Sequence, residues 1–209
     1  MSRNKTLTRR KILDAVGQLL VRSGMRGLGI NAISRQAGID KTLIYRYFGN
    51  LDELLRAYAD ENTLWPNTPD SSTASSGPER LASASKIISE FLIGRLNELR
   101  RQKIVQEILR GELIEENILT QALSQLREEQ KIELLARLHP DSRNVPGRDL
   151  EALLAFMNAA ISYMVLHSKF RDKHLGIDLH SNFGWKRLEK LTRDLVDAYF
   201  SRAPSAADR

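Results

Sequence analysis

The sequence predicts an all-α fold, with a small N-terminal domain of three helices followed by a larger helical domain. Two observations lead to this prediction. Apolar residues recur at spacings of three and four in the long segments, which is the period of an amphipathic helix. Stretches containing glycine and proline separate these segments, and we find neither the alternation of a strand nor an internal repeat.

The first helix is predicted to begin near Thr8 and to end at Gly24 and Gly27. One apolar face runs along it, formed by Ile12, Leu13, Val16, Leu19 and Leu20. The second helix is short and turns three residues inward: Ile30, Ile33 and Ala37. These two helices are expected to pack on each other through their apolar faces.

A tight turn follows the second helix, because Gly38 tolerates the left-handed conformation that such a turn requires. Asp40 is predicted to cap the next helix by accepting from backbone N–H groups. Ile44 and Phe48 anchor this third helix in the core. Five side chains are then left to point outward: Lys41, Thr42, Tyr45, Arg46 and Tyr47. The arrangement is a helix-turn-helix.

A fourth helix is predicted from the segment Asn50-Leu51-Asp52-Glu53, which places an N-cap residue three positions before a glutamate. Leu54, Leu55 and Tyr58 follow as its apolar residues. We place the domain boundary here, with an N-terminal domain over residues 1–55 and a larger domain over residues 56–209.

The larger domain is divided by its Pro- and Ser-rich stretches. A flexible loop is predicted over about 66–79, and a second loop runs from His139 through Gly147. The segments predicted as helical are 79–110, ended by Gly111, then one or two helices over 113–138, then 149–170 and 181–200. Residues 169–180 are predicted to be a polar connection.

The net positive charge lies at the N-terminal end. Residues 1–60 contain eleven Lys or Arg against five Asp or Glu, and the remaining 149 residues contain 21 of each. A generally basic protein would spread its charge over both parts. This concentration predicts a polyanionic partner, since Lys and Arg that neutralise phosphates release condensed counterions.

Composition excludes several classes of protein. The chain has no cysteine, which excludes disulfides and thiolate chemistry and fits a reducing cytoplasm. It shows neither a signal peptide nor an apolar run of membrane-spanning length, so we expect a cytoplasmic protein with no membrane partner. The histidines are not paired at ligand spacing: His139, His167, His174 and His180. No phosphate loop or nucleophile elbow is present in the sequence. We expect no enzyme activity, no metal and no cofactor.

The N-terminal motifs resemble the TetR family of bacterial transcriptional regulators. The resemblance is carried by the helix start Arg10-Lys11-Ile12-Leu13-Asp14-Ala15, by residues 33–40, by residues 44–48 and by residues 51–54. It covers about a quarter of the chain, and the order and spacing of its parts make it specific. Three positions depart from the family pattern: Gly29 stands in place of a capping Thr, Tyr47 in place of His, and Leu51 in place of a Lys that contacts phosphate.

The resemblance implies double-stranded DNA as a partner, bound at a palindromic operator. The candidate DNA-binding residues lie on the second and third helices: Asn31, Arg35, Asp40, Lys41, Thr42, Tyr45, Arg46 and Tyr47. Family members also bind small effectors among their middle helices. The residues that could line such a pocket are Trp65, Phe91, Arg95, Asn97, Glu107, Phe156, Asn158, Ser162 and Tyr163. The alternatives are plain core for Phe91 and Phe156, and solvated or paired side chains for Arg95, Asn97 and Glu107.

A homodimer is predicted from the last two helices. The helix over 149–170 is apolar or small nearly all round, more than one neighbouring helix of its own subunit would cover. With the last helix it resembles the pair that forms the four-helix interface of the family. Our candidates for this interface are Met157, Ile161, Met164, Trp185, Leu188, Leu191, Leu195 and Tyr199. The alternative is that these residues form the core of a single subunit.

Two functional hypotheses follow. The first is a ligand-responsive transcriptional regulator, a repressor that a small effector releases from its operator. The second is a non-enzymatic DNA-binding adaptor or DNA-organising protein that has no effector. A partly polar cavity among residues 80–166 would favour the first, and a filled core would favour the second.

Overall fold

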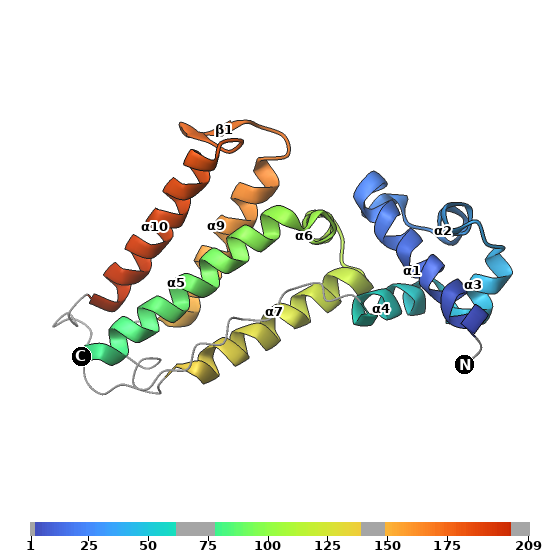
Figure 1. The fold of residues 1–209 in the computed structure, drawn as a ribbon, viewed down its shortest axis with the longest axis horizontal. Coiled ribbons are helices and arrows are strands. Elements are labelled where there is room, and N and C mark those ends of the chain that lie inside the picture. Colours follow the sequence, from blue (N-terminus) through green and yellow to red (C-terminus); the bar gives the residue numbers. More distant parts are fainter. Residues whose placement is uncertain (1–2, 62–77, 139–148, 202–209) are drawn as a thin grey trace. The chain divides into compact units, whose positions relative to one another are not determined.

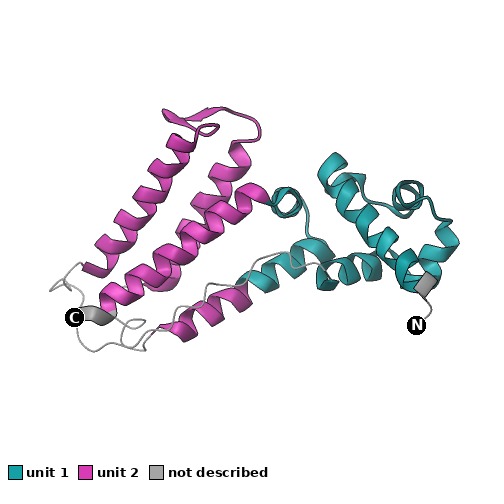
Figure 2. Cartoon of the chain, viewed as in Figure 1, with its two compact units in different colours: residues 1–66, 102–127 teal, residues 67–101, 128–209 magenta. Residues whose placement is uncertain are grey.

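The computed structural model describes residues 3–61, 78–138 and 149–201, and within them the fold is all-α apart from one short hairpin (Figure 1). The chain forms two compact units, which are coloured separately in Figure 2. Unit 1 contains residues 1–66 and 102–127, and unit 2 contains residues 67–101 and 128–209. This division differs from a boundary at residue 55, because a helix from the middle of the chain packs into unit 1.

Unit 1 is built around the first helix. Its elements are α1 (Arg3–Ser23), the 3₁₀ helix η1 (Met25–Gly27), α2 (Ile30–Ala37), α3 (Lys41–Phe48), α4 (Leu51–Glu61), α6 (Lys103–Glu112) and the first part of α7 (Ile118–Arg137). α1 packs against α2, α4 and α6, and α3 packs against α2 and α4. The apolar face predicted for α1 is confirmed, since its five residues are buried: Ile12, Leu13, Val16, Leu19 and Leu20.

A close approach of three helices centres on Gly17 of α1. A Cβ at this position would lie 2.9 Å from Tyr58 Oη of α4 and 3.5 Å from Ile104 Cδ1 of α6. Tyr58 is buried, and this desolvation, together with the nearby charge of Asp14, raises the pKa of Tyr58 to about 12. Glycine at position 17 therefore lets α4 and α6 pack on one side of α1.

The described part of unit 2 contains three long helices, the last part of a fourth, and a hairpin. Its helices are α5 (Pro78–Arg101), the last part of α7, α9 (Leu150–His167) and α10 (Asn182–Ser201), and its strands are β1 (Lys173–His174) and β2 (Ile177–Asp178). α5 packs against both α9 and α10. Asp149 caps α9, because its Oδ1 accepts from the Ala152 N–H at 2.8 Å.

Polar contacts join α5 to α10. Ser85 Oγ donates to Asp197 Oδ1 at 2.5 Å, and Asn97 Nδ2 donates to Glu189 Oε1 at 3.0 Å. The Arg100 guanidinium lies 4.4 Å from the ring centroid of Trp185, a cation–π distance. Because the partner numbers fall along α10 as they rise along α5, the two helices are antiparallel.

Several predicted boundaries were wrong. The helix predicted over 79–110 is divided at Gln102, whose ψ of 86° is not helical. Gly111 does not end a helix but lies inside α6, where a Cβ would meet Cγ of Met25 at 2.5 Å. Its small size serves packing and not termination. α9 ends at His167 and not near residue 170.

The connection predicted over 169–180 contains the β1–β2 hairpin, with Lys173 paired to Asp178 and His174 to Ile177. Strands of two residues are too short to show the alternation by which a strand is recognised in a sequence. The loops predicted over about 66–79 and 139–147 lie outside the described residues, except that Pro78 and Glu79 already belong to α5.

Candidate nucleic-acid interface

The turn between α2 and α3 has the geometry that its sequence predicts. Gly38 has φ 64° and ψ 37°, the left-handed conformation expected at the C-cap of α2. Its N–H donates to the Arg35 carbonyl at 3.3 Å, and the Ile39 N–H donates to the Ser34 carbonyl at 3.1 Å. Ser34 Oγ donates to the Ile39 carbonyl at 2.6 Å. The turn thus satisfies its own backbone groups and fixes the direction in which α3 starts.

Asp40 caps α3, as predicted. Its Oδ1 accepts from the Thr42 N–H at 2.8 Å and from the Thr42 hydroxyl at 2.6 Å. These two hydrogen bonds, the hydroxyl first, lower the pKa of Asp40 below its ordinary value. The carboxylate is therefore ionised at neutral pH and holds the first turn of α3, and with it the side chain of Thr42.

α3 presents one face to the core and the other to solvent. Ile44 and Phe48 are buried, while four of the five predicted outward side chains are exposed: Lys41, Thr42, Tyr45 and Arg46. The fifth, Tyr47, is half-buried, and the Arg46 guanidinium lies 5.9 Å from the centroid of its ring. The rotation predicted for α3 is thus correct at these positions. That these side chains contact DNA remains a prediction.

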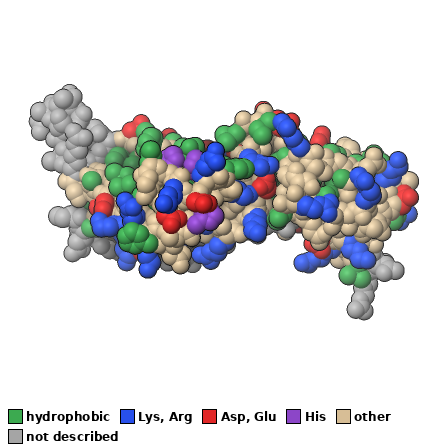
Figure 3. All heavy atoms as spheres, turned by 90° about the horizontal axis from the view of Figure 1, so that it is seen from above, with side chains coloured by type: hydrophobic (Ala, Val, Ile, Leu, Met, Phe, Trp, Pro, Cys, Tyr) green, Lys and Arg blue, Asp and Glu red, His purple; other side chains and the backbone are tan. Residues whose placement is uncertain are grey.

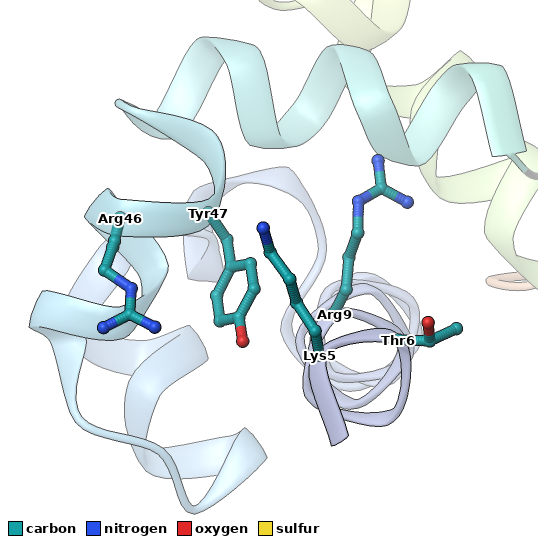
Figure 4. Close-up of a pocket in the computed structure, with 5 residues that line it drawn as sticks. All are labelled: Lys5, Thr6, Arg9, Arg46 and Tyr47. Carbon is teal, nitrogen blue, oxygen red and sulfur yellow. The ribbon is translucent and has the colours of Figure 1, made fainter. Parts of the chain in front are cut away.

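A basic cleft lies beside α3. It has a volume of about 410 Å³ and is lined by Lys5, Thr6, Arg9, Arg46 and Tyr47 (Figure 4). In the view of Figure 4 the ring of Tyr47 lies between the side chains of Arg46 and Lys5. Three cations beside an aromatic ring form a site suited to phosphate oxygens, which accept from Lys and Arg.

The three cations of this cleft have different surroundings. Arg9 forms an ion pair with Glu61, and its guanidinium lies 5.2 Å from the centroid of the Phe48 ring. Arg9 thus ties α1 to α3 and α4. By contrast, no carboxylate of the described residues forms an ion pair with Lys5 or Arg46. We therefore expect Lys5 and Arg46 to supply the phosphate contacts and Arg9 to hold the cleft together.

The candidate list from the sequence lacked Lys5, Thr6 and Arg9. Lys5 and Arg9 stand four residues apart and so share one face of α1, a signal that was available in the sequence. The sequence did not reveal that this end of α1 lies beside α3. The two candidates on α2, Asn31 and Arg35, are both exposed, and Arg35 Nε donates to the Asn31 carbonyl at 3.4 Å.

The residues predicted to line an effector pocket are not all brought together. Glu107 belongs to unit 1, where it is buried and forms an ion pair with Arg110 at 3.2 Å. Asn97 contacts α10 through Glu189, as described above. Trp65 lies outside the described residues. Phe156 is 74% exposed and Tyr163 is 53% exposed, so neither belongs to the core of its own subunit.

The other pocket candidates lie on α5 and α9 of unit 2. Arg95 is buried on α5, and Phe91 on the same helix is half-buried. Asn158 and Ser162 are half-buried on α9. Asn158 Nδ2 donates to the Leu154 carbonyl at 2.8 Å, whereas its buried Oδ1 accepts no hydrogen bond from the described residues.

The predicted dimer residues fall into two groups. Met157, Ile161 and Trp185 are buried within the subunit, which is the single-subunit core that we had kept as the alternative. Trp185 Nε1 also donates to the Leu179 carbonyl at 2.7 Å. Leu191 and Leu195 are exposed, and three candidates are half-buried: Met164, Leu188 and Tyr199.

α9 keeps much of its apolar surface uncovered. Its mean hydropathy is 1.4, and only 33% of its 18 residues are buried. By length and composition it could cross a membrane, but a helix covered by another protein subunit meets the same criterion. Figure 3 shows hydrophobic side chains at the surface around the histidines, which among the described residues occur only in unit 2.

A capped recognition helix, an ordered turn and an adjacent basic cleft define a helix-turn-helix DNA-binding protein. Residues 12–58 match the family described as "Bacterial regulatory proteins, tetR family". The match covers the N-terminal helix-turn-helix domain, which is therefore of the TetR type.

Solved structures share the fold over most of the chain. The fatty acid degradation regulator FadR from Bacillus halodurans has a TM-score of 0.56 at 15% identity, over 90% of this chain and 97% of that chain. NalD, the secondary repressor of the MexAB-OprM multidrug efflux pump in Pseudomonas aeruginosa, has a TM-score of 0.56 at 18% identity, over 90% and 95%.

The regulator FadR from Bacillus subtilis, solved in complex with stearoyl-CoA, has a TM-score of 0.55 at 15% identity, over 90% of this chain and 97% of that chain. No curated protein sequence matches the chain.

Proposed function

We propose that the protein is a cytoplasmic homodimeric repressor that binds a palindromic operator and is released from it by a small effector. The observation that carries the DNA-binding part is the exposed, capped α3 with the basic cleft beside it. Lys41 and Arg46 lie on the exposed side of this helix, and Lys5 approaches from α1. A two-fold dimer would place two such helices in successive major grooves.

The dimer is supported by uncovered apolar side chains on α9 and α10. We define the α9–α10 surface as Phe156, Tyr163, Leu191 and Leu195, all exposed in the single chain. Apolar residues of this size, exposed at several places on two helices that both pack on α5, are typical of an interface that a second subunit covers. This surface replaces the buried residues Met157, Ile161 and Trp185 in our prediction of the interface.

The effector is supported by polar groups in the interior of unit 2. A buried acceptor such as Asn158 Oδ1 loses free energy unless a donor reaches it, and a bound small molecule could supply that donor. Stearoyl-CoA is bound to one structural neighbour, so amphipathic acyl-CoA thioesters are the ligand class that we propose.

Selection of genomic DNA fragments by the purified protein tests the proposal. We expect fragments that share two inverted half-sites about one helical turn apart, and their binding should weaken steeply with added salt. Fragments with a single half-site, or without any shared sequence, would contradict the operator. Acyl-CoA thioesters of increasing chain length, added to the complex, then test the effector. An acyl-CoA that acts as the effector should lower operator affinity by the factor by which it binds the DNA-free protein more tightly than the DNA-bound protein.

The adaptor or DNA-organising protein without an effector remains the second hypothesis. It predicts selected fragments of low sequence preference and complexes that no small molecule releases.

A further inference from the structure

Two acidic residues stand at the end of α4 that disfavours them. α4 ends at Glu61, and its last turn contains Asp60 and Glu61 but no basic residue. The unpaired carbonyl groups at a helix C-terminus carry partial negative charge, so carboxylates are unfavourable there. Both residues are exposed. The last turn of α4 thus has an excess of negative charge that the stability of the helix does not explain.

The side chain of Glu61 is paired with Arg9 of α1. Asp60, the residue before it, forms no ion pair with the described residues. The side chains of Arg9 and Glu61 are 35% and 45% exposed, so water and ions reach both. An ion pair with this exposure contributes little to folding stability. Arg9 can therefore exchange Glu61 for another anion at small cost to the fold.

The basic cleft offers that exchange, because Arg9 lines it together with Lys5 and Arg46. In Figure 4 the side chains of Arg9 and Arg46 extend in opposite directions. A carboxylate and a phosphate accept the same pair of parallel N–H donors from a guanidinium. A DNA phosphate at the cleft and the carboxylate of Glu61 are thus alternative partners for Arg9.

From this arrangement we propose that Glu61 competes with DNA phosphate for the guanidinium of Arg9, and so lowers the affinity of the protein for DNA of any sequence. The inference rests on the proposed DNA binding and adds a residue that opposes it. Glu61 acts through Arg9, so it is a positioning residue. Phosphate contacts carry no sequence information, and withholding one in each subunit leaves base contacts a larger share of the affinity for an operator.

Glu61→Gln tests the competition, since it removes the charge and keeps the size of the side chain. Binding of the full chain to a labelled random-sequence DNA duplex, measured by fluorescence anisotropy at several salt concentrations, should tighten. The slope of log K against log salt should become steeper by about 0.9 for each subunit on the DNA, which at roughly 0.1 M salt is a gain of at most about eightfold in affinity.

Asp60→Asn is the matched control. It removes the same charge from the adjacent exposed residue but breaks no ion pair with the described residues, so the salt slope should stay that of the wild type. Arg9→Ala provides the second control. In that background Glu61→Gln should change neither the affinity nor the slope, because the two residues act as one unit. The thermal unfolding midpoint of Glu61→Gln should stay close to that of the wild type.

The outcomes distinguish this inference from the proposed function. A wild-type protein that does not bind the duplex, or binds it without salt dependence, would overturn both. Salt-dependent binding by the wild type with unchanged or weaker binding by Glu61→Gln would overturn the inference alone. An equal gain in Asp60→Asn, or the same gain without Arg9, would also overturn it, because net charge would then determine the affinity.

Discussion

Replacing Arg46 by alanine should change the salt dependence of operator binding by a predictable amount. Arg46 is exposed on α3, lines the basic cleft and forms no ion pair with the described carboxylates. A dimer would lose two phosphate contacts. Since each contact contributes about 0.9 to the slope of log K against log salt, the slope should become shallower by about 1.8.

This change in slope has a measurable consequence. The ratio of wild-type to variant affinity should fall by about tenfold between roughly 50 and roughly 200 mM salt, because the variant releases fewer counterions. Fluorescence anisotropy of a labelled operator at several salt concentrations gives the slope directly. Arg193→Ala is the control, since Arg193 is exposed on α10 in unit 2 and should leave the slope unchanged. An unchanged slope for Arg46→Ala would show that this residue does not contact phosphate.

Further outcomes are expected at four residues. Tyr47→Phe should cost about 0.5–1.5 kcal/mol of operator affinity through one lost hydrogen bond, and Tyr47→Ala should cost more because the ring is lost too; equal affinities would remove Tyr47 from the interface. Leu195→Glu should give folded monomers in sedimentation, whereas Trp185→Ala should lower the free energy of unfolding by about 3–5 kcal/mol in denaturant titrations, because Trp185 is a core residue. In a spectrophotometric titration one tyrosine, Tyr58, should ionise near pH 12. The free energy of unfolding should fall between about pH 10 and 12, because this tyrosine ionises first in the unfolded chain. The late titration step should be absent in Tyr58→Phe, which checks the assignment.

The N-terminal domain could be predicted because its signals are local. Gly38 is left-handed and Asp40 caps α3, and each follows from the chemistry of one residue and its next two or three neighbours. Asn50 likewise caps α4 by accepting from the Glu53 N–H at 2.8 Å. The buried residues of α1 followed from periodicity alone, because this helix has a single apolar face.

The sites in the larger domain depend on tertiary neighbours, and there the sequence was a poorer guide. α9 is apolar nearly all round, so its pattern could not separate the buried Met157 from the exposed Phe156. Only the packing of α5 makes that distinction. Likewise, Lys5 lines the cleft beside α3 because of the way α1 packs in unit 1, and no local sequence pattern encodes that packing. The positive φ of Leu175, in the loop of the β1–β2 hairpin, was not predicted because the strands on either side are only two residues long.

The polar contacts between α5 and α10 set how these two helices are aligned along each other. The pairs Ser85–Asp197 and Asn97–Glu189 lie about three turns apart on α5 and about two turns apart on α10, so a shift of α10 along α5 by one turn would break both at once. The side-chain hydrogen bonds of Asn158 on α9 stay within that helix, and its buried face toward the core is apolar. Displacement of α9 therefore exchanges one set of apolar contacts for another, while displacement of α10 breaks the hydrogen bond that the buried Ser85 hydroxyl donates. The polar contacts thus fix the register between α5 and α10, whereas the buried residues of α9 that face the core are apolar.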